Sequence, residues 1–271
     1  MMIQWANKLF LGLLTLPRYF QYSVNEIQYD IKNFPFEGYK ILQLSDLHLG
    51  YGLKPKFLVS LIEKVSHLNP DIVVITGDLI ETDIESVLPA LDVLKDMTTR
   101  YPTYFVLGNH DFQYNPPTVV LEILNSLGIK VLMNESVLIG TEDSGFHLAG
   151  VSDPITRIYE LDKYYPDIER TLQDTRKESA IVLLSHRPIV RFCEKKHGID
   201  LVLSGHIHGG QIFPFGMLSI WFKEDSGEKI SVSDKSFDSC YLHVSKGLGF
   251  TTLPFRFLAR SEISLITIGA K

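Results

Sequence analysis

The fold of this 271-residue chain is constrained most by short apolar runs that alternate with helical patterns. In the first half, strands are predicted at residues 39–45, 71–76 and 103–107, and helices at 55–68, 84–97 and 118–127. The helix at 55–68 carries its apolar residues at one-face spacing: Phe57, Leu58, Leu61, Ile62, Val65 and Leu68. Strands without polar alternation between helices indicate sheets that are covered on both faces.

The second half contains further strand patterns at 129–132, 137–139, 146–150, 180–185, 199–204, 240–245 and 262–268. One helix is expected at about 188–197, and no repeat or linker divides the chain. We therefore predict one α/β domain over residues 22–271. Its expected architecture is a four-layer αββα sandwich, in which two packed mixed sheets are flanked by helices.

Chemically active side chains follow the apolar strands at five places. They are Asp46-Leu47-His48, Gly77-Asp78, Gly108-Asn109-His110-Asp111, His186 and Gly205-His206-Ile207-His208. Each motif alone has a simpler explanation as a turn, a helix cap or a surface loop. Together, at strand ends, they predict a site where carboxylates, imidazoles and one carboxamide hold two divalent cations about 3.5–4 Å apart.

The net charge, the cysteines and several single residues narrow the range of possible functions. A net charge of −6 disfavours nucleic acid as a partner. Cys193 and Cys240 form no metal-binding spacing and no disulfide framework, so a reducing compartment is expected. Asp153 is predicted to be a turn residue, and four histidines are predicted to be structural: His67, His147, His197 and His243.

The N-terminus, residues 1–21, is predicted to form an apolar helix. Trp5, Leu9, Leu13 and Leu16 lie at helical spacing, and the uninterrupted apolar run 9–14 is far shorter than the ~20 residues of a membrane span. Two alternatives stay open, a helix lying on a bilayer surface and a helix docked on the core.

The ordered motifs between residues 40 and 208 resemble those of the calcineurin-like metallophosphoesterase family. Residues 205–211 (GHIHGGQ) and 244–260 (VSKGLGFTTLPFRFLAR) are similar to the branch of YkuE- and YaeI-like phosphodiesterases that includes UDP-2,3-diacylglucosamine pyrophosphatase. The resemblance implies the two-sheet sandwich. It also implies that Asp46, His48 and His208 hold one metal, that Asn109, His186 and His206 hold the other, and that Asp78 bridges them. His110 would approach the phosphate, with Asp111 orienting it.

The resemblance favours Mn²⁺, and the ligand types also admit Fe²⁺, Zn²⁺, Co²⁺ or Ni²⁺. Apolar segments at 212–222 and 253–258 suggest an acyl-chain groove or a lip that dips into a membrane, or else segments that cover the core. Candidate substrate contacts are Arg187, Phe213, Phe215 and Arg256, and Lys246 and Arg260 are further candidates for binding a diphosphate.

The expected activity is hydrolysis of a lipid-linked phosphodiester or diphosphate, such as UDP-2,3-diacylglucosamine. The expected location is cytoplasmic and peripheral on the inner membrane. Two alternatives are a phosphodiesterase for a soluble substrate and a non-catalytic metal-bound scaffold.

Overall fold

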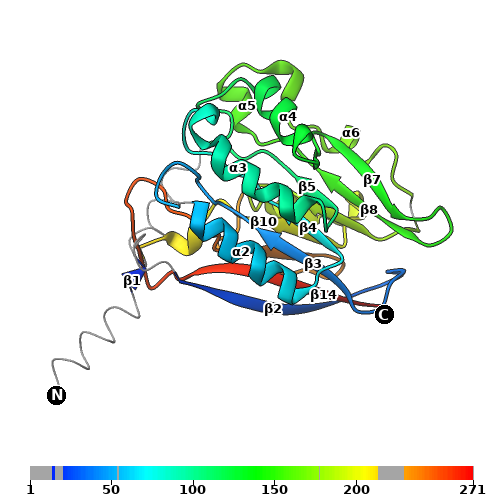
Figure 1. Ribbon diagram of the computed structural model, residues 1–271. Helices are drawn as coiled ribbons and strands as arrows, with labels where there is room; N and C mark the ends of the chain where they lie inside the picture. The colour runs from blue at the N-terminus through cyan, green and yellow to red at the C-terminus, as the bar shows by residue number, and fades with distance from the viewer. Residues whose placement is uncertain (1–13, 16–20, 54, 177, 213–228, 271) are drawn as a thin grey trace.

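Two six-stranded sheets pack face to face in the computed structural model, and helices cover the outer face of one of them (Figure 1). The structure describes residues 14–15, 21–53, 55–176, 178–212 and 229–270. The predicted αββα arrangement of two mixed sheets with helices is confirmed. Over the outer face of the second sheet, this layer is reduced to short elements such as α6 (Ile168–Leu172), whose Ile168 packs with Ile181 and Leu183.

The first sheet has the order β2-β14-β3-β4-β5-β6. Its strands are β2 (Tyr22–Ile31), β14 (Ser261–Ala270), β3 (Tyr39–Leu44), β4 (Ile72–Ile75), β5 (Thr103–Phe105) and β6 (Ile129–Val131). Strands β3 to β6 run parallel, whereas β14 is antiparallel to β3 and parallel to β2. The carboxyl ends of β3, β4 and β5 therefore lie at one edge of the sheet.

The second sheet has the order β11-β12-β10-β9-β8-β7. Its strands are β11 (Lys235–Ser236), β12 (Tyr241–Val244), β10 (Leu201–Ser204), β9 (Ile181–Leu184), β8 (Gly145–Gly150) and β7 (Glu135–Gly140). The four central strands are parallel, and the two edge strands are antiparallel to their neighbours.

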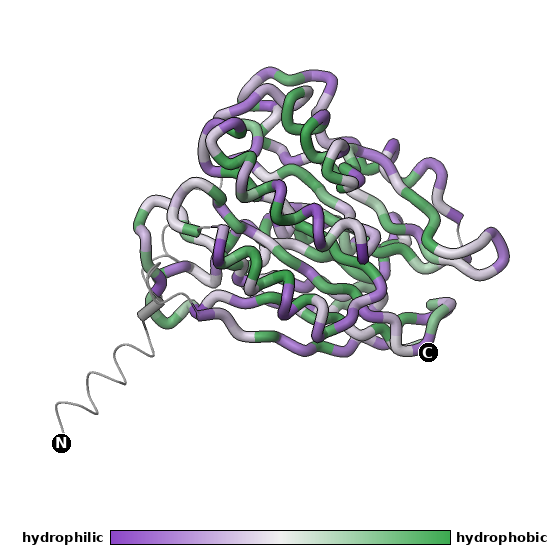
Figure 2. The backbone as a smooth tube through the Cα atoms, in the orientation of Figure 1, coloured by the Kyte–Doolittle hydropathy of each residue, from purple (hydrophilic) through white to green (hydrophobic). Residues whose placement is uncertain are grey.

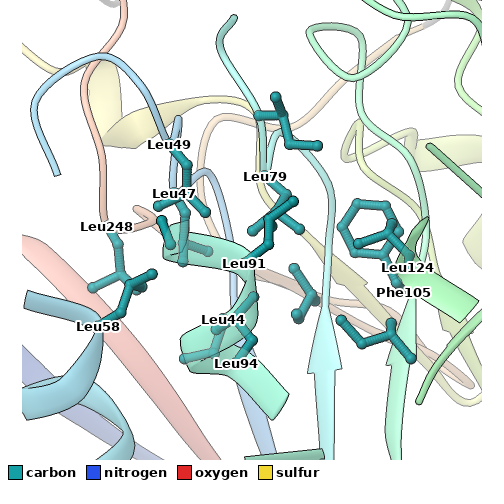
Figure 3. Packing of buried hydrophobic residues seen from close by; sticks show 14 of the residues in the cluster. Leu44, Leu47, Leu49, Leu58, Leu79, Leu91, Leu94, Phe105, Leu124 and Leu248 are labelled. Atoms are coloured by element: carbon teal, nitrogen blue, oxygen red, sulfur yellow. The ribbon is translucent and has the colours of Figure 1, made fainter. Parts of the chain in front are cut away.

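Alternate side chains of each strand enter different apolar layers, as the strand period of two requires. Leu42 and Leu44 of β3 join the layer under helices α2 (Pro55–Leu68), α3 (Ile84–Thr98) and α4 (Pro117–Ser126), whereas Ile41 joins the layer between the sheets. Figure 2 shows apolar residues along the central strands, and Figure 3 shows Leu44 of β3 packed with Leu94 of α3.

Helix α2 has the predicted bounds, and the other predicted helices and strands of the first half differ by at most three residues at an end. The helix predicted at 188–197 is wrong. Two short 3₁₀ turns, η3 (Val190–Cys193) and η4 (Lys195–His197), stand in its place. Glu194, between the two turns, has extended backbone with φ −68° and ψ 133°, so the chain cannot continue as one helix through residues 188–197.

The expectation of no disulfide is also wrong, because Cys193 and Cys240 are joined by one. It links η3 to the residue before β12, 47 positions along the chain. Disulfides persist mainly in oxidising compartments. The two cysteines therefore no longer support the expectation of a reducing compartment.

Part of the predicted N-terminal helix is a strand instead. β1 (Leu14–Thr15) pairs antiparallel with β13 (Arg256–Phe257), and the other residues before 21 lie outside the described part of the chain. No helix of the described residues has the length and apolar content that crossing a bilayer requires.

Candidate metal centre

All five polar motifs lie where parallel strands end, at the edge shared by the two sheets. Asp46 and His48 follow β3, Asp78 follows β4, and Asn109 follows β5. His186 follows β9 of the second sheet, and His206 and His208 follow β10. The packing of the sheets therefore brings residues 160 positions apart into contact, as the hydrogen-bond distance between His48 and His208 demonstrates.

The first cluster comprises Asp46, His48, Asp78 and His208, which each offer one ligand atom within a mutual distance of 4.8 Å. His208 Nε2 lies 3.0 Å from His48 Nε2 and 3.3 Å from Asp46 Oδ1. Ligand atoms bonded at ~2.1 Å to one octahedral cation lie about 3 Å apart. The spacing therefore fits a divalent cation, and all four residues are buried.

The second cluster comprises Asp78, His186 and His206. His186 Nε2 lies 3.2 Å from Asp78 Oδ2, from Asn109 Oδ1 and from His206 Nδ1. The amide oxygen of Asn109 thus completes a set of one carboxylate, two imidazoles and one carboxamide. Asp78 belongs to both clusters, and its Oδ2 also lies 3.7 Å from His48 Nε2, as a carboxylate between two ions would.

The electrostatics of this site favour cations. Burial would raise the pKa of Asp78, but the positive charge of His186 and His110 holds it well below its ordinary value. Burial alone would lower the pKa of His186, whereas the charge of Asp78 raises it to about 10. Burial lowers the pKa of His208 to about 4, which leaves that imidazole neutral. Charged carboxylates and neutral imidazoles are the forms that bind metal, so Asp78 and His208 are already in that form, whereas a cation bound at His186 would displace the proton of its ring.

The backbone of the site is strained in a way that the sequence pattern does not reveal. Five of its residues adopt left-handed conformations, with φ between 45° and 70°: Asp46, His48, Asp78, His206 and His208. Such conformations cost about 1–3 kcal/mol each and cluster at functional sites. Gly108 permits the loop after β5 to lie close to Asp78, because a Cβ at this position would overlap Oδ1 of Asp78.

Hydrogen bonds between the loops hold this strained backbone in place. The loops after β3 and β4 remain paired beyond the strands, with His48 N donating to Asp78 O at 3.0 Å and Leu49 N to Leu79 O at 2.8 Å. Ser45 Oγ donates to Asp46 Oδ2 at 2.5 Å. The ligand atoms are thus oriented before any metal binds.

The two clusters are partly exposed to solvent on one side. Asn109, His110 and His206 are partly exposed, whereas the other residues of the two clusters are buried. The His110 ring stands edge-on to the His48 ring, with a centroid distance of 4.9 Å. A substrate that approaches the centre would therefore meet Asn109, His110 and His206.

Glu81 is a site residue that the sequence reasoning missed. Its Oε2 lies 2.5 Å from His48 Nδ1 and 2.7 Å from His110 Nδ1. Burial alone would lower the pKa of His110, but Asp78 and Glu81 raise it to about 9. The sequence feature that could have indicated Glu81 is its position, three residues after Asp78 and directly after the apolar pair Leu79-Ile80.

The expectation that Asp111 orients His110 is wrong. Its carboxylate oxygens accept hydrogen bonds from four backbone N–H groups, those of Asp78, Leu79, Ile80 and Gly108, at 2.8–3.0 Å. Asp111 therefore ties the loop after β4 to the loop after β5, and Glu81 is the carboxylate beside His110.

The predicted substrate contacts have different surroundings. Arg187 is buried, and its Nε lies 3.1 Å from Oδ2 of Asp153, which gives that predicted turn residue an ion-pair role. Arg256 is fully buried and donates to main-chain carbonyls, so the expectation that it contacts substrate is wrong. Phe213 and Phe215 lie outside the described residues.

The two other predicted cations contact polar side chains of the protein. Lys246 forms an ion pair with Glu262 at 2.9 Å. Arg260 lies 3.5 Å from the side-chain oxygen of Gln21. The four histidines predicted to be structural do not belong to the metal-ligand groups found among the described residues. One of them, His243, lies 2.9 Å from Ser264 Oγ and 3.1 Å from an Asp234 oxygen.

Residues 39–210 match the family model described as calcineurin-like phosphoesterase. An uncharacterized metallophosphoesterase of Helicobacter pylori is 35% identical over 84% of this chain and 59% of its own length. A Danio rerio protein, named transmembrane protein with metallophosphoesterase domain, is 32% identical over 91% of this chain and 57% of its own. The uncharacterized metallophosphoesterase YkuE of Bacillus subtilis is 30% identical, over 86% and 80%. The chain thus spans less than two thirds of the first two relatives.

A solved structure shares the fold at low sequence identity. The Thermus thermophilus sulfate thiohydrolase SoxB, in complex with glycerol, superimposes with a TM-score of 0.52 and 14% identity. The match covers 89% of this chain and 58% of that protein. At this identity the likeness concerns the two-sheet architecture alone.

Proposed function

The chain belongs to the calcineurin-like phosphoesterase family, and we propose that it uses two divalent metal ions to hydrolyse a phosphodiester or diphosphate bond. One observation carries the proposal. Asp78 is common to two clusters of ligand atoms, and His110 stands at their open side. A carboxylate between two cations, beside a group that can give up a proton, is the arrangement that phosphoester hydrolysis needs.

In this proposal Asp46, His48 and His208 bind the first ion, and Asp78 bridges both. Asn109, His186 and His206 bind the second. When bound, the two ions act as Lewis acids for the phosphoryl oxygens and for the attacking water. We propose Mn²⁺ as the metal on the resemblance to the family; the ligands, which combine imidazoles with hard oxygens and include no thiolate, accept Mn²⁺ and also Fe²⁺, Zn²⁺, Co²⁺ or Ni²⁺.

The protein's own residues supply orientation and a proton. We propose that His110 donates a proton to the leaving oxygen, since it is partly exposed beside both clusters. Glu81 holds Nδ1 of His110 through its 2.7 Å contact, which leaves Nε2 of the ring available to the substrate. A scaffold without turnover would have no need for this pair, which disfavours the non-catalytic alternative.

The direct test is hydrolysis of an aryl phosphodiester, bis(p-nitrophenyl) phosphate, by protein that has been stripped of metal and reloaded with Mn²⁺. Turnover that requires the metal and is absent in Asp78→Ala supports the proposal. Lack of turnover on phosphodiesters and on diphosphates, from protein that carries two ions, would refute it.

We further propose that the natural substrate is lipid-linked, in preference to the alternative of a soluble natural phosphodiester. Leu253 and Leu258 are 44% and 50% exposed, in the loop that contains β13. The side chain of Gln211, three residues after His208, bonds to the carbonyls of Thr251 and Leu253. The exposed leucines are therefore tied to the metal-binding loop, and β1 pairs with β13 within the same loop. We propose that this surface lies on a membrane.

Replacing both leucines with glutamate tests the membrane surface. If Leu253 and Leu258 enter a bilayer, the double variant Leu253→Glu/Leu258→Glu should bind neutral phosphatidylcholine vesicles roughly tenfold more weakly, because apolar area is lost from the lipid phase. Vesicle sedimentation of the full chain measures this. The matched control is Val59→Glu/Leu88→Glu, at residues that are 48% and 42% exposed on α2 and α3. Equal binding by both double variants would contradict the proposal.

UDP-2,3-diacylglucosamine is the substrate that we propose to try first. UMP release in detergent by the Mn²⁺-loaded protein, and not by Asp78→Ala, would support this assignment. If the protein cleaves bis(p-nitrophenyl) phosphate but releases no UMP, this substrate is excluded and the phosphodiesterase proposal stands.

A further inference from the structure

Arg256 is the largest fully buried side chain of the described residues that carries a charge. Its guanidinium contacts the carbonyl oxygens of Gly249, Lys246, His208 and Ala259 at distances of 2.8, 2.6, 3.2 and 3.4 Å, and Nδ1 of His208 at 2.9 Å. None of the described carboxylates lies within ion-pair distance of it. Because burying a charge without an ionic partner is costly, a specific gain must offset that cost.

The contacts of Arg256 lead to two residues of the first cluster. One is direct, because His208 offers both its carbonyl and its ring. The other passes through the backbone, since Arg256 holds Gly249 O while Gly249 N donates to Asp46 O at 2.6 Å. A Cβ at Gly249 would come within 2.7 Å of that same Asp46 oxygen, so the close contact depends on glycine.

His208 also lacks the kind of partner that orients His48 and His186. His48 Nδ1 faces the carboxylate of Glu81, and His186 Nδ1 faces the carbonyl of Thr76. Such acceptors usually fix the ring of a metal-binding histidine. At His208 the neighbour of Nδ1 is a guanidinium, which can only donate, so Nδ1 accepts a hydrogen bond here. Nε2 is directed at Asp46 Oδ1 and His48 Nε2, and it would give up its proton to a bound cation.

We propose that Arg256 is a positioning residue for the first metal ion: it fixes the ring of His208 and the backbone of Asp46, and it acts on the second cluster only through Asp78. The inference rests on the proposed two-metal site. Geometry and charge predict opposite effects for its removal. Loss of a positive charge alone would tighten cation binding, whereas loss of the support would weaken it.

The test is Mn²⁺ binding by equilibrium dialysis, without substrate, to Arg256→Met and Arg256→Lys. Both variants should bind one ion as the native protein does and the other at least about tenfold more weakly, the usual effect of removing a group that orients a ligand. Arg256→Lys keeps the charge but cannot reach His208 Nδ1 and Gly249 O together. Arg260→Lys, at an exposed position, is the control and should bind both ions normally.

Combining Arg256→Lys with a second substitution that removes a ligand from one cluster identifies the affected site. In Asn109→Ala, which is altered in the second cluster, Arg256→Lys should weaken the remaining tight site. In Asp46→Ala it should leave the remaining site unchanged. Leu148→Ala, at a fully buried position between the sheets, controls for general destabilisation and should keep the metal-induced rise in melting temperature.

Three results would overturn the inference: tighter binding in Arg256→Met, unchanged binding in both arginine variants, or equal weakening of the two sites. Because the measurement contains no substrate, a failed phosphodiesterase assay would not affect it.

Discussion

Asp78→Asn should abolish binding of at least one metal ion and reduce phosphodiester turnover by more than the ~10–100-fold that follows loss of an orienting group. The reason is that Asp78 Oδ2 lies within 3.7 Å of nitrogens from both clusters. Asparagine has nearly the same shape but offers one neutral oxygen, so it cannot bridge two cations as a carboxylate does. Elemental analysis of the purified variant measures the number of bound ions directly.

Thermal unfolding gives a second measure of the same change. A ligand present at 100 times its dissociation constant stabilises the folded state by about 2.7 kcal/mol. For a domain of this size, that corresponds to a rise in melting temperature of roughly 5–11 °C per ion. Asp78→Asn should lose at least one such increment.

The matched control is Asp71→Asn, an exposed carboxylate that accepts a hydrogen bond from Lys40 N at 2.7 Å. This variant should keep both increments and full turnover. If Asp78→Asn retains two ions with native affinity, Asp78 is not the bridging ligand and the assignment of both clusters fails.

The sequence was sufficient to predict where the site lies. Each motif stands directly after an apolar strand, and in parallel sheets the carboxyl ends of neighbouring strands must meet at one edge. That rule alone places Asp46, Asp78 and Asn109 together, since β3, β4 and β5 are adjacent in the sheet. Packing of two sheets then adds His186 and His208 from β9 and β10.

The sequence could not reveal what depends on loop conformation. Glu81 reaches His48 and His110 because the loop after β4 pairs with the loop after β3, and no strand or helix period describes that path. The left-handed conformations of Asp46 and His208 are likewise set by long-range hydrogen bonds rather than by local preference.

The edge strand β2 shows a different limit. Residues 22–31 keep no constant alternation, because the apolar positions shift phase between Val24 and Ile27. This strand forms through its ten-residue pairing with β14, from the opposite end of the chain. Strand propensity is decided largely by such neighbours, and a neighbour more than 230 residues away leaves no local signal.

His110→Ala should reduce kcat on a dialkyl phosphodiester by about 10²–10⁴-fold, the contribution of a positioned general acid, while both metal ions remain bound. Turnover should fall while metal content stays unchanged, because His110 contacts Glu81 and the His48 ring but belongs to neither proposed ligand set. Elemental analysis together with initial rates on bis(p-nitrophenyl) phosphate and on a dialkyl phosphodiester measures it. His67→Ala, an exposed histidine on α2, is the control and should change neither quantity.

The leaving group makes this test specific for proton donation. An alkoxide leaves poorly without a proton, whereas p-nitrophenolate needs little assistance, so His110→Ala should harm the dialkyl substrate far more than the aryl one. Glu81→Gln should give the same ranking with a smaller loss, since it weakens the hold on His110 Nδ1 without removing the ring. An equal loss on both substrates would assign His110 to binding the phosphoryl group. A loss of metal that parallels the loss of turnover would make it a ligand.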